Sequence, residues 1–255
     1  MNPAVATATS TPVSHPALRR TRIKMCGLTR EADVEAAVAA GADAIGFVMY
    51  EKSPRHVNPE RAKALAQRLP PFVTPVCLFV NASVQTVRET VATVGSALVQ
   101  LHGDESPEYA AALGLPHMRA ARVPLGLEGQ GFNLLEFGKL HASANGILLD
   151  ALIDGYGGGG KTFDWTAFHW SQLPPSVSSR LVLSGGLTPA NVTDGICQVR
   201  PWAVDVSSGI EQDDANGKPL RGIKDPKKMW QFVQAVREAD ATLNATHVAR
   251  VTPAG

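Results

Sequence analysis

Short apolar runs alternate with segments of helical periodicity from residue 22 to about residue 240. Most of these runs, such as ILLD at 147–150 and LVLS at 181–184, are almost continuously apolar. Such runs are typical of parallel strands that are buried on both faces. They predict strands at Arg22–Cys26, Ala44–Met49, Pro75–Val80, Ala97–Leu101, His117–Val123, Gly146–Asp150, Arg180–Ser184 and Ala203–Val206.

The segments between the runs predict helices. Valines recur at three- and four-residue spacing, as on one buried helix face, at Val84, Val87, Val91 and Val94. Between the fifth and sixth runs the chain is interrupted by glycine, and only Phe132–Leu140 is expected to be helical. A capping residue followed by proline marks the expected start of a helix. This pair occurs at Asn58-Pro59, Ser106-Pro107, Thr188-Pro189 and Asp225-Pro226.

Strands that alternate with helices in this number predict a single-domain α/β protein, a closed (β/α)8 TIM barrel. An open, doubly wound parallel sheet is the alternative. We expect the barrel at residues 21–240, a disordered N-terminal extension at 1–20 and a C-terminal tail at 241–255. The extension lacks the continuous apolar stretch of a secretory signal, and an organelle-transit segment is its alternative interpretation.

The composition narrows the class of function. Hydrophobic residues make up 44% of the chain, which permits a large core, and the formal net charge of +1 gives no reason to expect nucleic acid or an anionic membrane as partner. No apolar run is long enough to cross a bilayer. The cysteines, Cys26, Cys77 and Cys197, form no C-x-x-C pair, so the sequence supports neither a metal site nor a redox motif. A reducing, cytoplasmic setting is the simplest interpretation.

In either fold, function is expected just beyond the carboxyl ends of the strands. Strand one ends at Cys26, whose thiolate would be a base or a nucleophile; a small core residue is the alternative. Strand six ends at Asp150, whose apolar neighbours suit a general acid; a turn or cap aspartate is the alternative. In a barrel these two groups could face opposite sides of one small substrate.

Glycine- and serine-rich loops follow three consecutive strands. GYGGGGKT at 155–162 follows strand six, SGG at 184–186 ends strand seven, and SSG at 207–209 ends strand eight. Free backbone amides and hydroxyls can bind an anion, and the loops after strands seven and eight form the recurring phosphate site of these barrels. A flexible linker is the alternative for the first loop.

Two further side chains follow strand ends. Arg55, after strand two, could hold a carboxylate with two hydrogen bonds, or be a solvated loop charge. His102, after strand four, could bind or orient a substrate, or be a structural histidine.

These residues, in this order, resemble the phosphoribosylanthranilate isomerase family. The resemblance spans most of residues 22–240, and the combination of motifs is highly specific. The matching stretches are IKMCGLT (23–29), ADAIGFVMYEKSPRHV (42–57), LFVN (78–81), VQLHGDES (99–106), ILLDA (147–151), GGGGKTFDW (157–165), LSGGLTPANV (183–192) and VDVSSGIE (204–211).

The resemblance implies a cofactor-free enzyme of tryptophan biosynthesis that catalyses an Amadori rearrangement. Phosphoribosylanthranilate becomes the open-chain carboxyphenylamino-deoxyribulose phosphate. Cys26 matches the general base that removes the proton at ribose C2, and Asp150 matches the general acid that protonates the furanose oxygen. Cys26 would need either a lowered pKa or deprotonation assisted by the substrate.

The same resemblance places Arg55 at the anthranilate moiety, with His102 and Asp205 near the substrate. The expected partner is a small phosphorylated substrate, without nucleic acid, membrane or metal, and the chain is expected to be a monomer or a homodimer. The expected phosphate-binding residues are Gly158, Gly159, Gly160, Gly185, Gly186, Ser207, Ser208 and Gly209.

The chain departs from the family pattern at three places. Gly159 stands where the family usually has a hydroxyl residue, the turn after Glu211 is longer than usual, and the N-terminal extension has no counterpart. We expect the long turn, residues 212–221, to lie on the active face and to cover the site.

The histidine-pathway isomerase is a rival, but it uses two aspartates where this chain has Cys26. A catalytic lysine expected of indole-glycerol-phosphate synthase is not evident, and a non-catalytic phosphate-binding barrel would not need both Cys26 and Asp150.

Overall fold

A closed parallel barrel forms the centre of the molecule. The computed structural model describes residues 18–96, 98–151, 162 and 164–251. Each strand pairs with its neighbours in the sequence, and β1 pairs with β8 as well as with β2, so the barrel closes. The strands are β1 Arg22–Cys26, β2 Ala44–Val48, β3 Thr74–Phe79, β4 Leu98–Leu101, β5 His117–Val123, β6 Gly146–Ala151, β7 Leu181–Leu183 and β8 Ala203–Val206. The (β/α)8 prediction is confirmed, and the open sheet is excluded.

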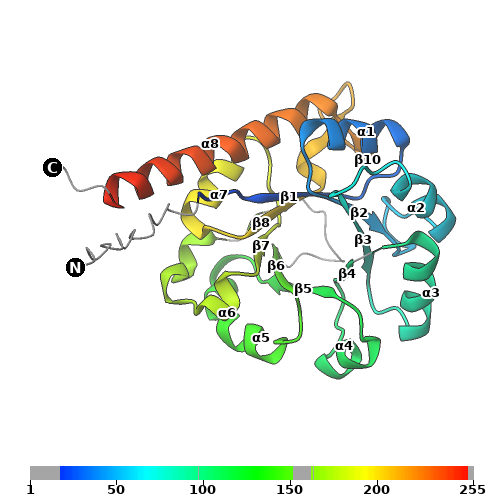
Figure 1. The fold of residues 1–255 in the computed structure, drawn as a ribbon, viewed down its shortest axis with the longest axis horizontal. Helices are drawn as coiled ribbons and strands as arrows, with labels where there is room; N and C mark the ends of the chain where they lie inside the picture. The colour runs from blue at the N-terminus through cyan, green and yellow to red at the C-terminus, as the bar shows by residue number, and fades with distance from the viewer. Residues whose placement is uncertain (1–17, 97, 152–161, 163, 252–255) are drawn as a thin grey trace, which may run out of the picture.

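Helices surround the barrel as a ring (Figure 1). They cover the outward side chains of the strands, as parallel sheets require. The α-helices are α1 Glu31–Ala40, α2 Pro59–Ala66, α3 Val84–Val94, α4 Pro107–Leu113, α5 Leu134–Leu140, α6 Pro175–Ser178, α7 Val192–Val199 and α8 Pro226–Val251. Short 3-10 helices lie at Gly126–Gly131, Trp165–Ala167, Trp170–Gln172 and Ser208–Ile210.

Three of the four predicted capping pairs begin a helix. The side chain of Asn58 accepts from Arg61 N at 2.8 Å, and that of Asp225 accepts from Lys227 N at 2.8 Å. Ser106 likewise caps α4. The prediction for Thr188-Pro189 was wrong, because that pair lies in a turn and α7 begins only at Val192.

Side chains along each strand alternate between the surrounding helices and the barrel interior. On β6, Ile147 and Leu149 belong to the large core beneath the helices, whereas Leu148 belongs to a separate cluster inside the barrel. Asp150, two residues beyond Leu148, therefore points to the interior as well. By the same alternation Cys26 points inward from β1, where it packs with Val48 and Leu78.

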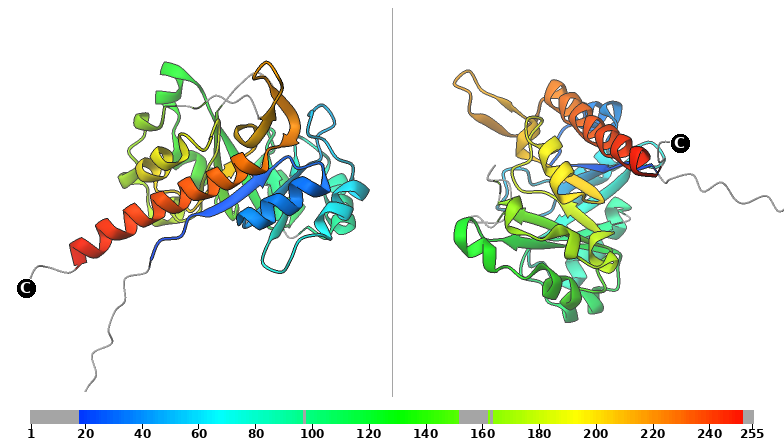
Figure 2. Two further views of the ribbon diagram at one scale, coloured as in Figure 1. Left: turned by 90° about the horizontal axis from the view of Figure 1, so that it is seen from above. Right: turned by 90° about the vertical axis from the view of Figure 1, so that its left-hand side faces the viewer.

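The C-terminal helix and the start of the described chain lie together (Figure 2). The expected boundary at residue 240 does not coincide with a break, since α8 continues to Val251. Asn244 accepts from Arg19 N at 2.7 Å and donates to Arg19 O at 3.0 Å. Arg19, which belongs to the expected extension at 1–20, is thus attached to α8; residues 1–17 lie outside the described residues.

We expect Asp240 to contribute strongly to stability. Its carboxylate is 5% exposed and accepts from Thr21 N at 2.8 Å and from Thr21 Oγ1 at 2.7 Å. Replacing Asp240 by alanine leaves these buried donors without an acceptor, so we expect a loss of about 2–4 kcal/mol of unfolding free energy. Urea denaturation measures the loss, and Glu238→Ala, on the exposed side of α8, is the matched control. Equal stabilities of the two variants would contradict the expectation.

The long turn after Glu211 forms an antiparallel hairpin of β9 Glu211–Asp213 and β10 Pro219–Lys224, which stands out from the barrel (Figure 2). It follows β8 and therefore lies on the face formed by the carboxyl ends of the strands. Thr29 Oγ1 donates to Gly222 O at 2.9 Å, so the hairpin contacts the loop after β1.

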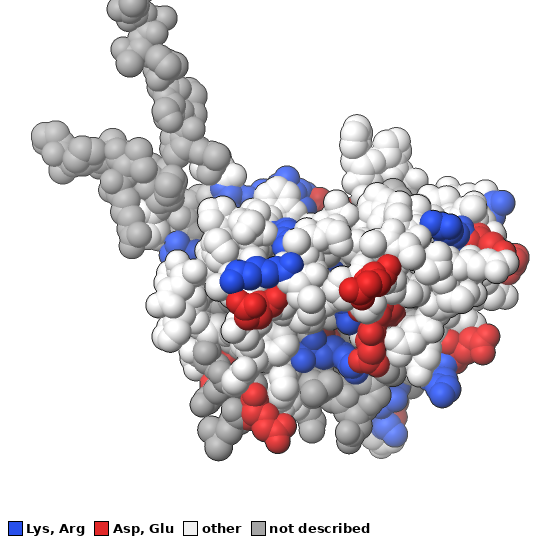
Figure 3. Space-filling view, turned by 90° about the horizontal axis from the view of Figure 1, so that it is seen from below, with Lys and Arg blue, Asp and Glu red and all other residues white. Residues whose placement is uncertain are grey.

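Charges of both signs are interspersed on the face seen in Figure 3. This distribution resembles a solvated surface and differs from the single-sign patch typical of a nucleic-acid interface. Within the described part of the chain, no helix has the length and apolar character needed to cross a membrane.

Candidate active site

Cys26 lies at the carboxyl end of β1 and is 4% exposed. Burial raises the pKa of its thiol above the ordinary value, and the neighbouring Lys24 opposes that rise. A lowered pKa, the first of the two expected routes to a thiolate, is therefore not found without substrate. Deprotonation assisted by the substrate stays a prediction.

Lys24 and Asp205 form a buried ion pair beside this thiol. Nζ of Lys24 lies 2.8 Å from Oδ1 of Asp205, and the two side chains are 5% and 6% exposed. Burial acts against the charged form of Lys24, but Asp205 and Cys26 raise its pKa above the ordinary value. Asp205, expected near the substrate, therefore forms its ion pair with a residue of the neighbouring strand, because β8 pairs with β1.

Asp150 lies at the other side of the barrel, near the end of β6, and is 7% exposed. Its Oδ2 is 3.1 Å from Nε2 of His102, and its Oδ1 accepts from Ala151 N at 2.9 Å. The distance to His102 is short, although the angles do not satisfy a hydrogen bond to Nε2. Nδ1 of His102 lies 3.0 Å from Nε2 of Gln100. The structure therefore brings His102 to Asp150 rather than leaving it as an isolated loop residue.

The loop after β7 passes directly over Asp150. A β-carbon on Gly185 would lie 3.0 Å from Oδ1 of Asp150 and 2.6 Å from Ala151 N, and Gly185 has φ +77°. Any larger residue would push this loop away from the carboxylate. The glycine at 185 thus lets one of the expected phosphate loops approach the expected acid.

The loops after β7 and β8 meet each other. A β-carbon on Gly209 would run into the carbonyl oxygen of Leu187. Together with the hairpin and the start of α8, the two loops line a cavity of about 240 Å³, and its lining includes Gly186, Ser208, Gly209, Pro219 and Lys228. Ser207 does not line this cavity. Its Oγ donates to Cys26 O at 3.0 Å. The expected phosphate residues Gly158, Gly159 and Gly160 lie outside the described residues.

Arg55 is not a solvated loop charge, because it is 6% exposed. Its guanidinium makes a two-pronged ion pair with Glu211, Nε to Oε1 at 2.6 Å and Nη2 to Oε2 at 2.8 Å. Burial alone would raise the pKa of Glu211, but Arg55 and Lys224 hold it below the ordinary value. The side-chain hydrogen bonds of Arg55 use Nε and Nη2, and Nη1 donates to no described residue.

Lys224, on β10, links this ion pair to the β8 loop. Its Nζ donates to Ser207 O at 2.8 Å and lies 3.3 Å from Oε1 of Glu211. Burial lowers the pKa of Lys224 to about 8 against the opposing effect of Glu211. The base of the hairpin therefore contacts the site, through the Glu211–Arg55 ion pair and the bond from Lys224 to Ser207 O. The tip of the hairpin stands away from the barrel (Figure 2).

The sequence interpretation missed four contributors: Lys24, Gln100, Glu211 and Lys224. Lys24 carried a usable signal, since a lysine in the otherwise apolar strand IKMC must be buried and paired. Gly46 carried another, because a glycine inside a strand often marks a close approach. Glu211 ends the matching stretch VDVSSGIE and Lys224 follows the long turn, and neither position by itself indicated its partner.

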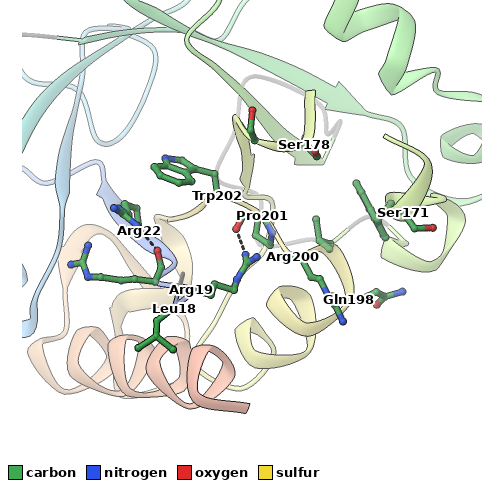
Figure 4. A pocket seen from close by; sticks show the side chains of 13 residues that line it. Leu18, Arg19, Arg22, Ser171, Ser178, Gln198, Arg200, Pro201 and Trp202 are labelled. Atoms are coloured by element: carbon green, nitrogen blue, oxygen red, sulfur yellow. Dashed lines mark hydrogen bonds between the residues drawn. The ribbon is translucent and has the colours of Figure 1, made fainter. Parts of the chain in front are cut away.

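A separate cavity of about 640 Å³ lies at the opposite, amino-terminal end of the barrel. Figure 4 shows Arg19, Arg22 and Arg200 around it, together with the indole of Trp202. Arg19 donates to Pro201 O. None of the expected acid–base residues lines this cavity, and in such barrels the catalytic groups lie at the other end.

Comparisons with known proteins address the whole barrel. The family model for N-(5'phosphoribosyl)anthranilate (PRA) isomerase matches residues 23–235. The N-(5'-phosphoribosyl)anthranilate isomerase of Methylibium petroleiphilum is 54% identical over 229 residues, covering 90% of this chain and 100% of that relative. The phosphoribosyl anthranilate isomerase structure from Thermotoga maritima has a TM-score of 0.72 at 37% identity, covering 86% of this chain and 100% of that one.

A further solved relative is described as PRA isomerase in complex with reduced 1-(o-carboxyphenylamino)-1-deoxyribulose 5-phosphate. It has a TM-score of 0.69 at 34% identity and covers 86% of this chain and 100% of that one. The family match includes every barrel strand except the first residue of β1, and with it Cys26, Asp150 and the loops beside them. The chain therefore belongs to the N-(5'-phosphoribosyl)anthranilate isomerase family.

Proposed function

We propose that this chain isomerises N-(5'-phosphoribosyl)anthranilate to 1-(2-carboxyphenylamino)-1-deoxyribulose 5-phosphate, with Cys26 as general base and Asp150 as general acid. In this reaction Asp150 protonates the ring oxygen as the furanose opens. The Cys26 thiolate then removes the proton at C2, and the enolamine that results becomes the ketone. The nitrogen lone pair of the substrate expels the ring oxygen, and the enolamine gains a proton at C1 and loses its hydroxyl proton. All electron pairs thus come from the substrate, and the protein needs only to transfer protons.

One observation carries the assignment of roles. Cys26 on β1 and Asp150 on β6 both point into the barrel at its carboxyl end, from strands that lie apart around the ring. A sugar held between them would present C2 to the thiol and the ring oxygen to the carboxyl group. Both groups retain slight exposure, 4% and 7%, so neither is sealed in the interior.

The surrounding loops support an orientation for the substrate. Gly185, Gly186 and residues 207–209 provide backbone amides and hydroxyls near Asp150 and Cys26, suited to a phosphate group. Arg55 lies on the β2 side, where its Nη1, which donates to none of the residues that the structure describes, could bind the anthranilate carboxylate. The substrate would then extend across the barrel mouth with the sugar between its two anionic ends.

Arg55→Ala is expected to raise KM for phosphoribosylanthranilate about 10- to 100-fold. This factor corresponds to the binding free energy lost with one hydrogen-bonded contact between charged groups. Steady-state kinetics measure the change. Arg68→Ala, which removes an exposed arginine that pairs with Glu35 on the outside of the barrel, is the control. Because Arg55 also neutralises the buried Glu211, the variant must first be shown to be folded. An unchanged kcat/KM in folded Arg55→Ala would exclude the carboxylate clamp.

The decisive test of the function is direct turnover. Purified protein is mixed with freshly made phosphoribosylanthranilate, and loss of the fluorescence of the anthranilate adduct is followed. We expect rapid, catalytic loss that depends on enzyme concentration. A rate equal to that of the spontaneous reaction, in protein shown to be folded, would reject the proposed function.

We also propose a cytoplasmic location, since Cys26, Cys77 and Cys197 are all free thiols, the state that a reducing compartment maintains. The assembly state, monomer or homodimer, stays a prediction that sedimentation equilibrium can decide.

A further inference from the structure

Three charged residues affect the pKa of the Cys26 thiol, the two lysines lowering it and Asp205 raising it. Lys24 lies two residues earlier on β1 and pairs with Asp205 of β8. Lys224 of β10 donates to Ser207 O, and the Ser207 hydroxyl donates to Cys26 O. Strands β2 and β3 contribute only the apolar neighbours Val48 and Leu78 and the bare backbone of Gly46. Among the described residues, the cluster that holds the thiol is otherwise apolar, with Val80 and the ring of Tyr50 packed against it.

Gly46 opens the space in which the thiol and the lysine meet. A β-carbon at this position would lie 2.6 Å from Sγ of Cys26 and 3.1 Å from Nζ of Lys24. Both groups therefore converge over the α-carbon of one strand residue. In this space the Lys24 ammonium also donates to Asp205 Oδ1, which lies 2.8 Å away.

An ion pair at this place is costly if it serves stability alone. The side chains of Lys24 and Asp205 are both nearly fully buried, and the loss of hydration on burying two charges commonly cancels their mutual attraction. Apolar residues of similar size would fill a barrel interior at least as well. A buried ammonium is useful where a neighbouring group must carry a negative charge during the reaction.

We propose that Lys24, held in place by Asp205, is the positioning residue that stabilises the Cys26 thiolate and aims it at the substrate. This inference deepens the proposed function and rests on it for the role of the thiol. Lys24 stabilises the thiolate, whereas Asp205 limits that effect and keeps the ammonium oriented. The proton taken from C2 resides on Sγ, while Lys24 stays charged through its contact with Asp205.

The two members of the pair have opposite electrostatic effects on the thiol, and this gives the test. The thiolate of Cys26 is titrated by its ultraviolet absorbance, as the difference between each protein and its Cys26→Ser derivative. Lys24→Met should move the midpoint up by about one pH unit or more, because the cation is lost and Asp205 stays. Asp205→Asn should move the midpoint down, because Lys24 then acts on the sulfur alone.

The double variant Lys24→Met/Asp205→Leu can be titrated if a single variant does not fold. It should fold because it leaves no unpaired charge in the interior. Its midpoint should lie between those of the two single variants. A purely structural pair would lower stability in both single variants without shifting the midpoints in opposite directions. The proposal would be overturned if the two single variants shifted the midpoint in the same direction. It would also be overturned if a folded single variant and the double variant both had the midpoint of the unaltered protein.

Turnover separates this inference from the proposed function. The titration needs no substrate, so the ordering of midpoints can hold even if phosphoribosylanthranilate is not converted, which would reject only the proposed function. If the substrate is converted, the pH at which kcat/KM rises should shift with the titrated midpoint in each variant. Conversion with a pH profile unaffected by Lys24→Met would reject Lys24 and leave the function intact.

Discussion

Replacement of Cys26 by serine is expected to lower kcat by about three orders of magnitude, the usual contribution of a general base. The hydroxyl of serine is close in size to the thiol but is far harder to deprotonate, so geometry is kept and basicity is lost. The expected effect is on kcat, because Cys26 acts on the proton at C2 and contributes little to binding. Steady-state turnover of phosphoribosylanthranilate measures it.

The matched control is Cys197→Ser, the same chemical change on α7, outside the barrel. It should retain the turnover of the unaltered protein. Thermal unfolding should show that Cys26→Ser is folded, since the exchange removes no atom from the cluster with Val48 and Leu78. Near-normal kcat in the folded variant would show that another group removes the proton.

The strands were predictable because their apolar runs are short and bounded. β1, β5 and β8 have the predicted limits, and the glycine-broken segment before β6 has its helix at Leu134–Leu140, inside the predicted Phe132–Leu140. The crossover from β6 to β7 was less predictable. Its helix α6 has only four residues, Pro175–Ser178, and so carries too few positions for a helical period to be recognised.

The C-terminal part of α8 shows a different limit. Residues after Ala241 lack a regular apolar stripe, and the sequence therefore indicated a tail. This part of the helix is joined to the chain start through Asn244, which binds the backbone of Arg19, a contact between residues 225 positions apart. Local periodicity contains no information on such a partner.

The same distinction separates the chemical groups that were predictable from those that were not. Cys26 and Asp150 could be singled out because each is a reactive residue at a strand end. Their neighbours are defined by pairing across the barrel: Lys24 meets Asp205 over 181 residues, and Arg55 meets Glu211 over 156. These contacts depend on strand register and on the path of the hairpin, which no motif specifies.

The acid side of the site is built more simply than the base side. Asp150 lies 3.1 Å from Nε2 of His102 and accepts from a backbone amide, and no lysine or arginine of the described residues forms an ion pair with it. Cys26, in contrast, lies among Lys24, Asp205 and Lys224. This asymmetry suits a pair in which the thiol must become an anion and the carboxyl group must hold a proton for the ring oxygen.

Replacement of Asp150 by asparagine is therefore expected to lower kcat by about three orders of magnitude as well. The amide has the same shape, and its oxygen can still accept from Ala151 N, but it has no acidic proton for the furanose oxygen. Turnover is measured as for Cys26, with Asp164→Asn as control, because Asp164 is an exposed aspartate that only caps a short helix.

Ring opening and proton removal at C2 occur in sequence, so a substrate that needs no acid distinguishes the two roles. A phosphoribosylanthranilate analogue that is already ring-opened would still need Cys26 but no longer Asp150. We expect Asp150→Asn to recover most of its activity on such an analogue, and Cys26→Ser to recover none. Equal loss in both variants on the open-chain compound would mean that Asp150 acts after the ring has opened, and the assignment of the acid would be wrong.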